Sequence, residues 1–317
     1  MFQLIGDIGG TNARLALIEE DGKIVHSETL SAADHKSFQG AIEAFLAKAP
    51  GEAPQRACFA VACPLSGDLV EFTNNPWSFS VSKLKAGLSL KDLFVINDFE
   101  AMARCLPHLA AKDVIQVGAG QMAEGSPKAV LGPGTGLGMA ALITHGQTAV
   151  PLATEGGHAR FAPANKREQD LNDVLVKTLG FVCNEDLISG RGLVNIYNGL
   201  CELEGVKAES WQAAEICSAA VDKTHPIAEE SFAMFWAILG SIAGDFALQT
   251  CALGGVYISG GIAPRYVDAI KNSEFRSRFV AKGTYRKYLE QISTFIVIEQ
   301  QPGLIGAASV LTRQGES

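Results

Sequence analysis

The chain has 317 residues and a formal net charge of −8, because 34 Asp and Glu residues outnumber 26 Lys and Arg residues. The hydrophobic fraction of 47% and the charged fraction of 19% exclude a disordered chain and predict about two domains with sizeable cores. The net acidity argues against a surface that coats nucleic acid, although an acidic protein can still bind an anion locally.

Cysteine usage and apolar stretches indicate the compartment. The seven cysteines are odd in number and contain no C-x-x-C pair, which is typical of free thiols in a reducing compartment. The segment 1–7 lacks the pattern of a signal peptide. Between Ser231 and Pro264 the only charge is Asp245, but glycines interrupt this stretch, so it predicts a buried helix, a turn and a buried strand instead of a membrane span. We therefore expect a cytoplasmic protein that binds neither membrane nor nucleic acid.

The first third of the chain predicts an α/β alternation around a mixed sheet. Short apolar runs at 2–7 and 13–18 and a third strand after Asp21-Gly22 predict an antiparallel meander. A helix is expected over 36–48, because its apolar residues share one face. The remaining expected elements are a buried strand at 57–65, a strand at 92–97 and a helix over 99–106.

The opening pattern recurs later in the chain. Residues 129–143 resemble 3–17, with Gly6 and Gly10 matching Gly132 and Gly136 at an offset of 126. A further strand at 148–153 follows the second copy, as a third strand follows the first. The repeat predicts two related α/β lobes.

Each copy of the repeat holds a glycine-rich loop between two expected strands. The first loop comprises Gly6, Asp7, Ile8, Gly9, Gly10, Thr11 and Asn12. Glycine allows backbone N–H groups to approach a phosphate, and an aspartate at a strand end suits a water-mediated contact to nucleotide-bound Mg²⁺. A strand follows the glycines and Gly-Lys-Ser/Thr is absent, so the loop is neither a Rossmann fingerprint nor a Walker loop. A hairpin turn without a ligand is the alternative.

Two further glycine-rich turns are candidates for binding the same nucleotide as the first loop. Gly134, Thr135 and Gly136 lie in the second copy, and two such loops in equivalent places are stronger evidence for a nucleotide than one. Gly260 and Gly261 follow an expected strand and would suit a flat adenosine, although a plain strand-to-helix turn is the alternative.

Polar residues predict the chemistry. Asn97 and Asp98 follow an expected strand, where Asp98 would suit a general base, while an N-cap role for Asp98 is the alternative. Glu155, His158 and Glu185 could together clamp the hydroxyls of a sugar. The alternative for the whole set is a metal site. Taken singly, each glutamate could be an exposed surface charge and His158 could be a core histidine.

Six motifs follow one another along the chain: Asp7 to Arg14, Ala62-Cys63-Pro64, Asn97-Asp98-Phe99, Gly134 to Gly138, Glu155 to His158 and Ser259 to Ile262. In this order they resemble the motifs of the bacterial ATP-dependent glucokinases of the proteobacterial type, over about residues 4–313.

The resemblance implies an α/β, actin/hexokinase-like (RNase H-like) fold with two lobes flanking a cleft. A small domain would comprise 1–108, completed by a C-terminal helix within 298–317, and a large domain would comprise 109–297. The implied reaction is transfer of the γ-phosphate of ATP to the 6-hydroxyl of glucose, with Mg²⁺, by a homodimer. Asp98 would be the base, and Asn74, Asn97, Glu155, His158 and Glu185 would contact the sugar. The segments 6–11 and 134–136 would bind phosphate.

Two features distinguish this chain from its relatives. Arg160 stands where the family more often has an acidic residue. Residues 159–182 contain no cysteine, which excludes the zinc-binding branch of related sugar kinases.

Other functional classes are alternatives to an enzyme. A sugar-sensing regulator would need a DNA-binding motif, and a filament protein would have no reason to keep the sugar-site residues. A kinase for another hexose is the alternative within the enzymes.

Overall fold

The computed structural model describes residues 2–72, 75, 77–146 and 148–312. The chain divides into two compact units, of which the first combines Met1–Leu109 with Glu299–Ser317 and the second comprises Ala110–Ile298. We call them the N-terminal unit and the central unit.

The N-terminal unit is built on a five-stranded sheet with the strand order β3-β2-β1-β4-β7. Neighbours among β1, β2 and β3 are antiparallel, whereas β1, β4 and β7 are parallel. Its elements are β1 (Gln3–Ile8), β2 (Asn12–Ile18), β3 (Ile24–Ser31), η1 (Ala32–Asp34), α1 (Phe38–Leu46), β4 (Arg56–Val61), β5 (Leu69–Glu71), β6 (Ser78–Ser80), α2 (Val81–Gly87), β7 (Asp92–Asn97), α3 (Asp98–Cys105), η2 (Leu106–His108) and α11 (Pro302–Thr312).

Local chemistry explains why these elements begin and end where they do. Gly22 has a positive φ of 87° at the β2–β3 turn, a conformation that glycine adopts at little cost. Ser37 caps α1 by accepting a hydrogen bond from the Gly40 N–H. β4 ends at Val61, earlier than the expected strand over 57–65, and Pro64 follows within that range.

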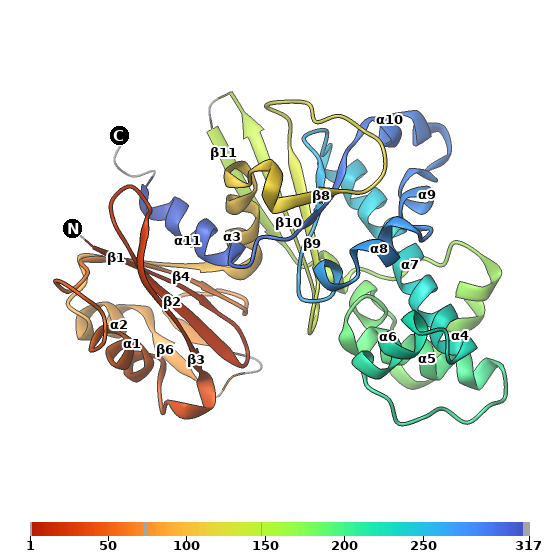
Figure 1. Ribbon diagram of the computed structural model, residues 1–317, viewed down its shortest axis with the longest axis horizontal. Coiled ribbons are helices and arrows are strands. Elements are labelled where there is room, and N and C mark those ends of the chain that lie inside the picture. The colour runs from red at the N-terminus through yellow and green to blue at the C-terminus, as the bar shows by residue number, and fades with distance from the viewer. Residues whose placement is uncertain (1, 73–74, 76, 147, 313–317) are drawn as a thin grey trace. The chain divides into compact units, whose positions relative to one another are not determined.

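The two faces of this sheet carry separate cores, because side chains alternate along each strand. Leu4 and Ile8 pack with α1, while Ile5 packs with apolar residues of α3 and α11. Figure 1 shows α1 on one face of the sheet and α3 with α11 on the other. This unit therefore has three layers, and α11 brings the end of the chain back to its beginning.

The central unit repeats the same topology. Its six-stranded sheet has the order β11-β10-β9-β12-β13-β8, in which β9, β10 and β11 are antiparallel neighbours and β9, β12 and β13 are parallel. The repeat expected from residues 3–17 and 129–143 is confirmed by this topology. The elements are η3 (Ala111–Asp113), β8 (Val114–Gln116), β9 (Lys128–Pro133), β10 (Leu137–His145), β11 (Thr148–Thr154), η4 (Gly156–His158), α4 (Lys166–Leu179), η5 (Asn184–Asp186), α5 (Gly190–Leu203), α6 (Ala213–Val221), α7 (Pro226–Thr250), β12 (Val256–Ile258), η6 (Ala263–Arg265), α8 (Val267–Lys271), α9 (Phe275–Val280), η7 (Gly283–Tyr285), α10 (Arg286–Gln291) and β13 (Thr294–Val297).

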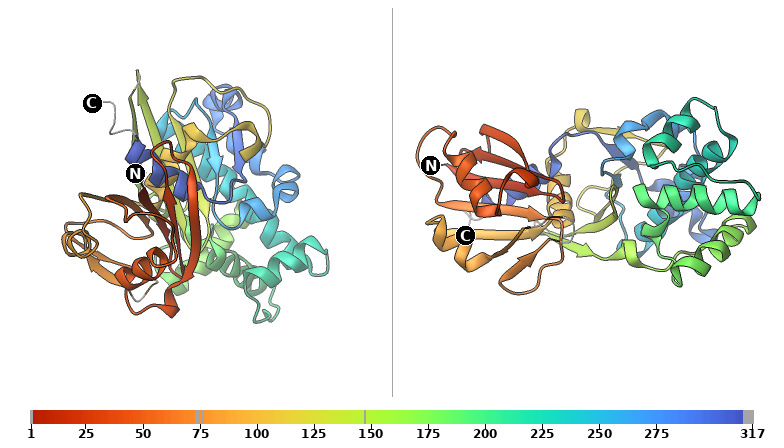
Figure 2. Two further views of the ribbon diagram at one scale, coloured as in Figure 1. Left: turned by 60° about the vertical axis from the view of Figure 1, so that its left-hand side comes forward. Right: turned by 90° about the horizontal axis from the view of Figure 1, so that it is seen from below.

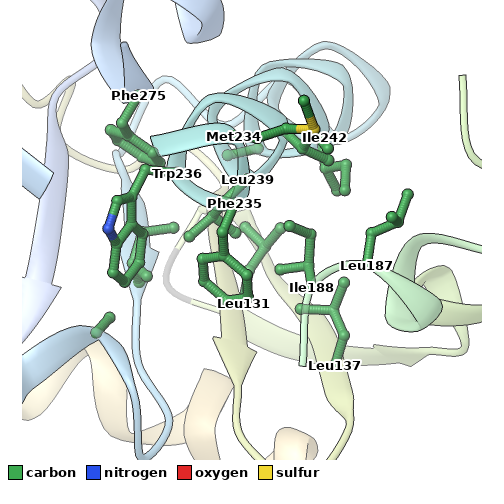
Figure 3. Close-up of a cluster of buried hydrophobic side chains, with 14 of the residues drawn as sticks. Leu131, Leu137, Leu187, Ile188, Met234, Phe235, Trp236, Leu239, Ile242 and Phe275 are labelled. Carbon is green, nitrogen blue, oxygen red and sulfur yellow. The ribbon is translucent and has the colours of Figure 1, made fainter. Parts of the chain in front are cut away.

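Helix α7 is the centre of the core of this unit. Figure 3 shows its residues Phe235 and Leu239 beside Leu131 of β9, with Ile188 nearby. The neighbouring helix α9 crosses closely, because a Cβ atom added to Gly240 would lie 2.1 Å from the Phe275 carbonyl oxygen. Helix α5 packs against both α4 and α6, which are among the green to teal helices at the right of the second view in Figure 2.

The long apolar stretch of the sequence is α7, a turn and β12, as expected. Among the described residues, α7 is the one helix long and apolar enough to cross a membrane, and most of it is buried inside the protein. It ends at Thr250, and its C-cap Cys251 has a φ of 50°, which places that residue in the left-handed region. Cys251 is exposed and the other six cysteines are buried, all of them as free thiols.

Candidate active site

In the N-terminal unit, three parallel strands end at the same edge of the sheet. The register places Ile8 at the end of β1 opposite Val61 of β4, and Val61 opposite Asn97 of β7. The loop Gly9–Thr11 and the pair Asn97-Asp98 therefore leave the sheet at one edge. In open α/β sheets, ligands bind at the carboxyl ends of the parallel strands.

Asn97, and not Asp98, is the N-cap of α3. The Asn97 Oδ1 atom accepts hydrogen bonds from the N–H groups of Phe99 at 2.9 Å and Glu100 at 3.2 Å. This corrects the alternative in which Asp98 serves as the cap. Asp98 Oδ1 accepts one hydrogen bond, also from the Phe99 N–H at 2.9 Å, and its second oxygen is not needed for capping.

The Asp98 carboxyl group has a raised pKa. Burial raises the pKa of its carboxyl group to about 6 against the lowering effect of the Phe99 N–H, and the charge of Asp7 raises it further. A base is most effective when its pKa lies near the working pH, because it is then ionised yet still able to take up a proton. The two carboxylates are close enough to influence each other, and both belong to this edge.

Asp7 lies near the end of β1 and is held from two sides. Its Oδ2 atom is 3.2 Å from Nη1 of Arg14 on the neighbouring strand. On the other side it lies against Gly303 in the first turn of α11. Burial raises the pKa of the Asp7 carboxyl group, and the charge and hydrogen bond of Arg14 oppose this effect.

The first glycine-rich loop contains residues with different surroundings. Gly6 is packed between Phe59 and Leu15, and Ile8 belongs to the core, so their side-chain positions face the interior. Gly9 and Gly10 are half-buried and Thr11 is exposed. Asn74, expected at the sugar, lies outside the described residues.

In the central unit, three glycine-rich segments converge at the end of β9. The loop Gly134–Gly136 closes the β9–β10 hairpin, where the Gly134 N–H donates to the Gly136 oxygen at 2.8 Å. The Gly190 N–H, at the start of α5, donates to the Gly134 oxygen at 2.8 Å. A Cβ atom added to Gly260 would lie 2.5 Å from the Pro133 oxygen, so only glycine allows this approach.

Glu185 is bound to the same hairpin. Its Oε2 atom accepts a hydrogen bond from the Leu137 N–H at 2.9 Å. A Cβ atom added to Gly136 would lie 2.5 Å from that oxygen. Its Oε1 atom lies 3.6 Å from the Arg191 guanidinium group, so one carboxylate oxygen is bound by the backbone and the other faces an exposed cation.

Glu155 is the N-cap of the short helix η4 and His158 is its last residue, and both are exposed. The Asn184 Nδ2 atom donates to the Gly156 oxygen at 3.2 Å, which joins this segment to the segment that carries Glu185. Arg160, the unusual residue of the sequence, has its guanidinium group 4.6 Å from the centre of the Phe181 ring. The structure thus brings Glu155, His158 and Glu185 onto two joined segments.

The donor set near the loops suits an ion that arrives with a nucleotide. Among the described residues, no three His, Cys, Asp or Glu side chains are grouped as a metal site. Asp7 offers one partly accessible carboxylate beside the glycine loop. Mg²⁺ is commonly bound through one or two carboxylates together with substrate phosphates, so Asp7 fits that arrangement.

Comparison with known proteins identifies the family. A glucokinase family model matches residues 4–314. A curated glucokinase from Hahella chejuensis (strain KCTC 2396) is 39% identical over 314 residues, which cover 99% of this chain and 98% of that protein. The chain belongs to the glucokinase family.

Solved structures agree with this assignment. The crystal structure of a glucokinase from an Antarctic psychrotroph is 38% identical, with a TM-score of 0.90 over 98% of this chain and 99% of that one. A ROK family glucokinase from Streptomyces griseus, solved with glucose and AMPPNP, is 21% identical, with a TM-score of 0.64 over 99% of this chain and 100% of that one. This second likeness shows the fold alone. The resemblance and the actin/hexokinase-like fold expected from the motifs are confirmed, and the chain is an enzyme of this family.

Proposed function

We propose that the chain phosphorylates the 6-hydroxyl of D-glucose with ATP and that its product, glucose 6-phosphate, feeds glycolysis. The observation that carries this proposal is the Asp98 carboxylate at the start of α3, directly after β7, where the charge of Asp7 reaches it and its pKa is raised to about 6. Family membership and the curated relative named glucokinase support the same activity.

In this mechanism Asp98 accepts the proton of the attacking hydroxyl. A sugar hydroxyl is a weak nucleophile, and phosphoryl transfer depends on positioning and charge stabilisation together with a carboxylate that takes the proton. Asn97 fixes the start of α3 and so holds the backbone of Asp98 in place. Asn97 and Asn74 would also contact the sugar.

The sugar and the nucleotide would be held by separate groups. Glu155, His158 and Glu185 accept and donate hydrogen bonds to the sugar hydroxyls, and the Leu137 N–H keeps the Glu185 carboxylate oriented. The backbone N–H groups of the glycine loops at 9–11 and 134–136 bind phosphate oxygens, and Gly260 and Gly261 approach the adenosine. Mg²⁺ bound to ATP would neutralise phosphate charge, and Asp7 would hold it through a water molecule.

We further propose that the N-terminal and central units are the small and large domains of the family. We also propose that the enzyme is a cytoplasmic homodimer. The net charge of −8 supports the proposal that the enzyme binds small molecules, glucose and ATP, and does not bind nucleic acid. Sedimentation equilibrium of the purified protein tests the dimer, and a monomer at micromolar concentration would contradict it.

A coupled assay of ADP release over a panel of sugars tests the activity. Glucose should give the highest kcat/KM, and phosphorus NMR of the product should show the phosphate at position 6. A folded protein that turns over fructose or mannose faster than glucose would instead be a kinase for another hexose. A folded protein that releases no ADP with any sugar would refute the proposal.

A further inference from the structure

Asn75 connects two backbone groups that are distant in sequence. Its Nδ2 atom donates to the Gly9 oxygen at 3.2 Å, and its Oδ1 atom accepts a hydrogen bond from the Trp77 N–H at 3.0 Å. One partner is an acceptor and the other a donor, so the orientation of the amide group is determined. Asn75 is only 8% exposed; its hydrogen bond with the Trp77 N–H is buried, and the one to the Gly9 oxygen is partly buried.

Trp77, whose N–H group Asn75 binds, lies in the core. Trp77 is 3% exposed, and its indole N–H donates to the His35 oxygen at 2.9 Å. The ring packs against Phe38 of α1 with centroids 5.6 Å apart. Trp77 is therefore a core residue, and the two hydrogen bonds of Asn75 connect it to the glycine loop.

Holding the Gly9 oxygen fixes the next N–H group. In a trans peptide the C=O of Gly9 and the N–H of Gly10 lie in one plane and point in opposite directions. The Gly10 N–H therefore points away from Asn75. Glycines on both sides of this peptide give it little resistance to rotation, so the hydrogen bond from Asn75 is what opposes a flip. Within the described part of the chain, the Gly10 N–H has no hydrogen-bond partner of its own.

We propose that Asn75 is a positioning residue for the nucleotide: by holding the Gly9 carbonyl, it keeps the Gly10 N–H directed at a phosphate oxygen. This inference rests on the proposed function to the extent that it takes the loop Gly9–Thr11 to bind a nucleotide. Asn75 itself does not touch the nucleotide in this proposal. It acts through the peptide that joins Gly9 and Gly10.

The central unit supplies a matched control. Asn184 is also 8% exposed, and its Nδ2 atom also donates to a glycine oxygen, that of Gly156, at 3.2 Å. Gly156 lies between Glu155 and His158, which the proposed function assigns to the sugar. The two asparagines thus make equivalent hydrogen bonds to loops assigned to different substrates.

The experiment compares Asn75→Asp with Asn184→Asp, because each variant keeps the acceptor oxygen and loses the amide donor. The KM values for ATP and glucose, kcat and the melting temperature are measured for both. Asn75→Asp should raise the KM for ATP about 5- to 10-fold, the value of one hydrogen bond, with a much smaller effect on the KM for glucose. Asn184→Asp should raise the KM for glucose and leave the KM for ATP nearly unchanged.

Asp also brings a negative charge toward the phosphates, so Asn75→Ser and Asn184→Ser repeat the comparison without charge. The serine hydroxyl can accept the Trp77 N–H but is one atom too short to reach Gly9. Either pair of variants suffices if the other does not fold. A merely structural role for Asn75 predicts a lower melting temperature with equal changes in both KM values, and that result would overturn the proposal. An unchanged KM for ATP would overturn it as well.

Calorimetric titration with AMPPNP in the absence of sugar separates this inference from the proposed activity. Weaker AMPPNP binding by Asn75→Ser than by the wild type would support the inference even if glucose were not the substrate. Equal AMPPNP affinity in the two proteins would refute it even if glucose kinase activity were established.

Discussion

The first turn of α11 lies directly against the Asp7 carboxylate: a Cβ atom added to Gly303 would lie 2.7 Å from the Asp7 Cγ atom. Residues near the two ends of the chain therefore share one contact at the edge where β1 ends. Because Gly303 has no side chain, there is room for the Asp7 carboxylate beside it. The guanidinium group of Arg14 forms an ion pair with the same carboxylate.

Replacing Gly303 with alanine should lower activity more than stability. The added methyl group displaces the Asp7 side chain, and a displacement of about 1 Å at a reacting centre costs up to about 100-fold in rate. The helix itself should gain, because alanine favours a helix over glycine by roughly 0.5–1 kcal/mol. We expect kcat to fall at least about 10-fold, with a melting temperature near that of the wild type.

Gly306→Ala is the matched control for that variant. Its Cβ atom would lie 1.9 Å from the Ala101 oxygen, a backbone atom that cannot move aside. This variant should lose thermal stability, because it separates α11 from α3. Full activity of Gly303→Ala would show that turnover does not depend on the exact position of the Asp7 carboxylate, and would contradict the prediction.

Replacing Asp98 with asparagine should reduce kcat by about 10²–10⁴-fold, the usual contribution of a general base. Glucose affinity should change far less, because the residues proposed to hold the sugar remain. The Asn97 cap is intact in this variant, so α3 is not destabilised. Steady-state kinetics and equilibrium binding of glucose measure both effects, and a fully active variant would exclude Asp98 as the base.

The same variant should be more stable than the wild type at neutral pH. The folded-state pKa of Asp98 is raised from 3.8 to about 6, so protonated Asp98 favours folding at low pH and this contribution is lost as the pH rises through 6. The ionised carboxylate opposes folding by no more than roughly 3 kcal/mol, and asparagine removes that cost. Melting curves at pH 4.5 and pH 7.5 should show the gain in Asp98→Asn mainly at the higher pH.

The pH profile of kcat/KM should have an acidic limb near pH 6. This quantity reports the pKa of the essential base in the free enzyme, and Asp98 must be ionised to accept a proton. Activity should fall about tenfold for each pH unit below the limb. A profile that stays flat down to pH 4.5 would be inconsistent with Asp98 as the base.

Turnover should require Mg²⁺ and be independent of zinc. Removal of divalent ions with EDTA should abolish ADP release, and Mg²⁺ alone should restore it, because the ion neutralises the phosphate charge. Asp7→Asn should raise the Mg²⁺ concentration that gives half-maximal activity. The absence of cysteine from residues 159–182 places this chain outside the zinc-binding branch, and a requirement for zinc would contradict that inference.

The sequence predicted those parts of the site that depend on local pattern. Strand ends, glycine loops and the pair Asn97-Asp98 are contiguous in the chain, so alternation of apolar residues and turn chemistry locate them. The repeat at an offset of 126 residues predicted that both units share one topology. Helices α4 to α6 were not predicted, although Asn165 and Ser189 cap α4 and α5 and the apolar residues of both helices lie on one face.

The supporting residues could not be found in this way. Asn75 binds Gly9 across 66 positions and Asn184 binds Gly156 across 28, and no local signal connects them. Gly303 resembles any other helical glycine until α11 is packed beside β1. The raised pKa of Asp98 has the same origin, since the burial that causes it arises only when the chain has folded.

The end of α7 has a practical consequence for handling the protein. Cys251 is the exposed thiol among seven free cysteines, and it holds a left-handed conformation that suits glycine. A maleimide dye should therefore attach at this single position and provide a site-specific fluorescent label. Exchange of Cys251 for glycine should relieve backbone strain and at the same time remove the thiol through which two molecules could become cross-linked during storage in air.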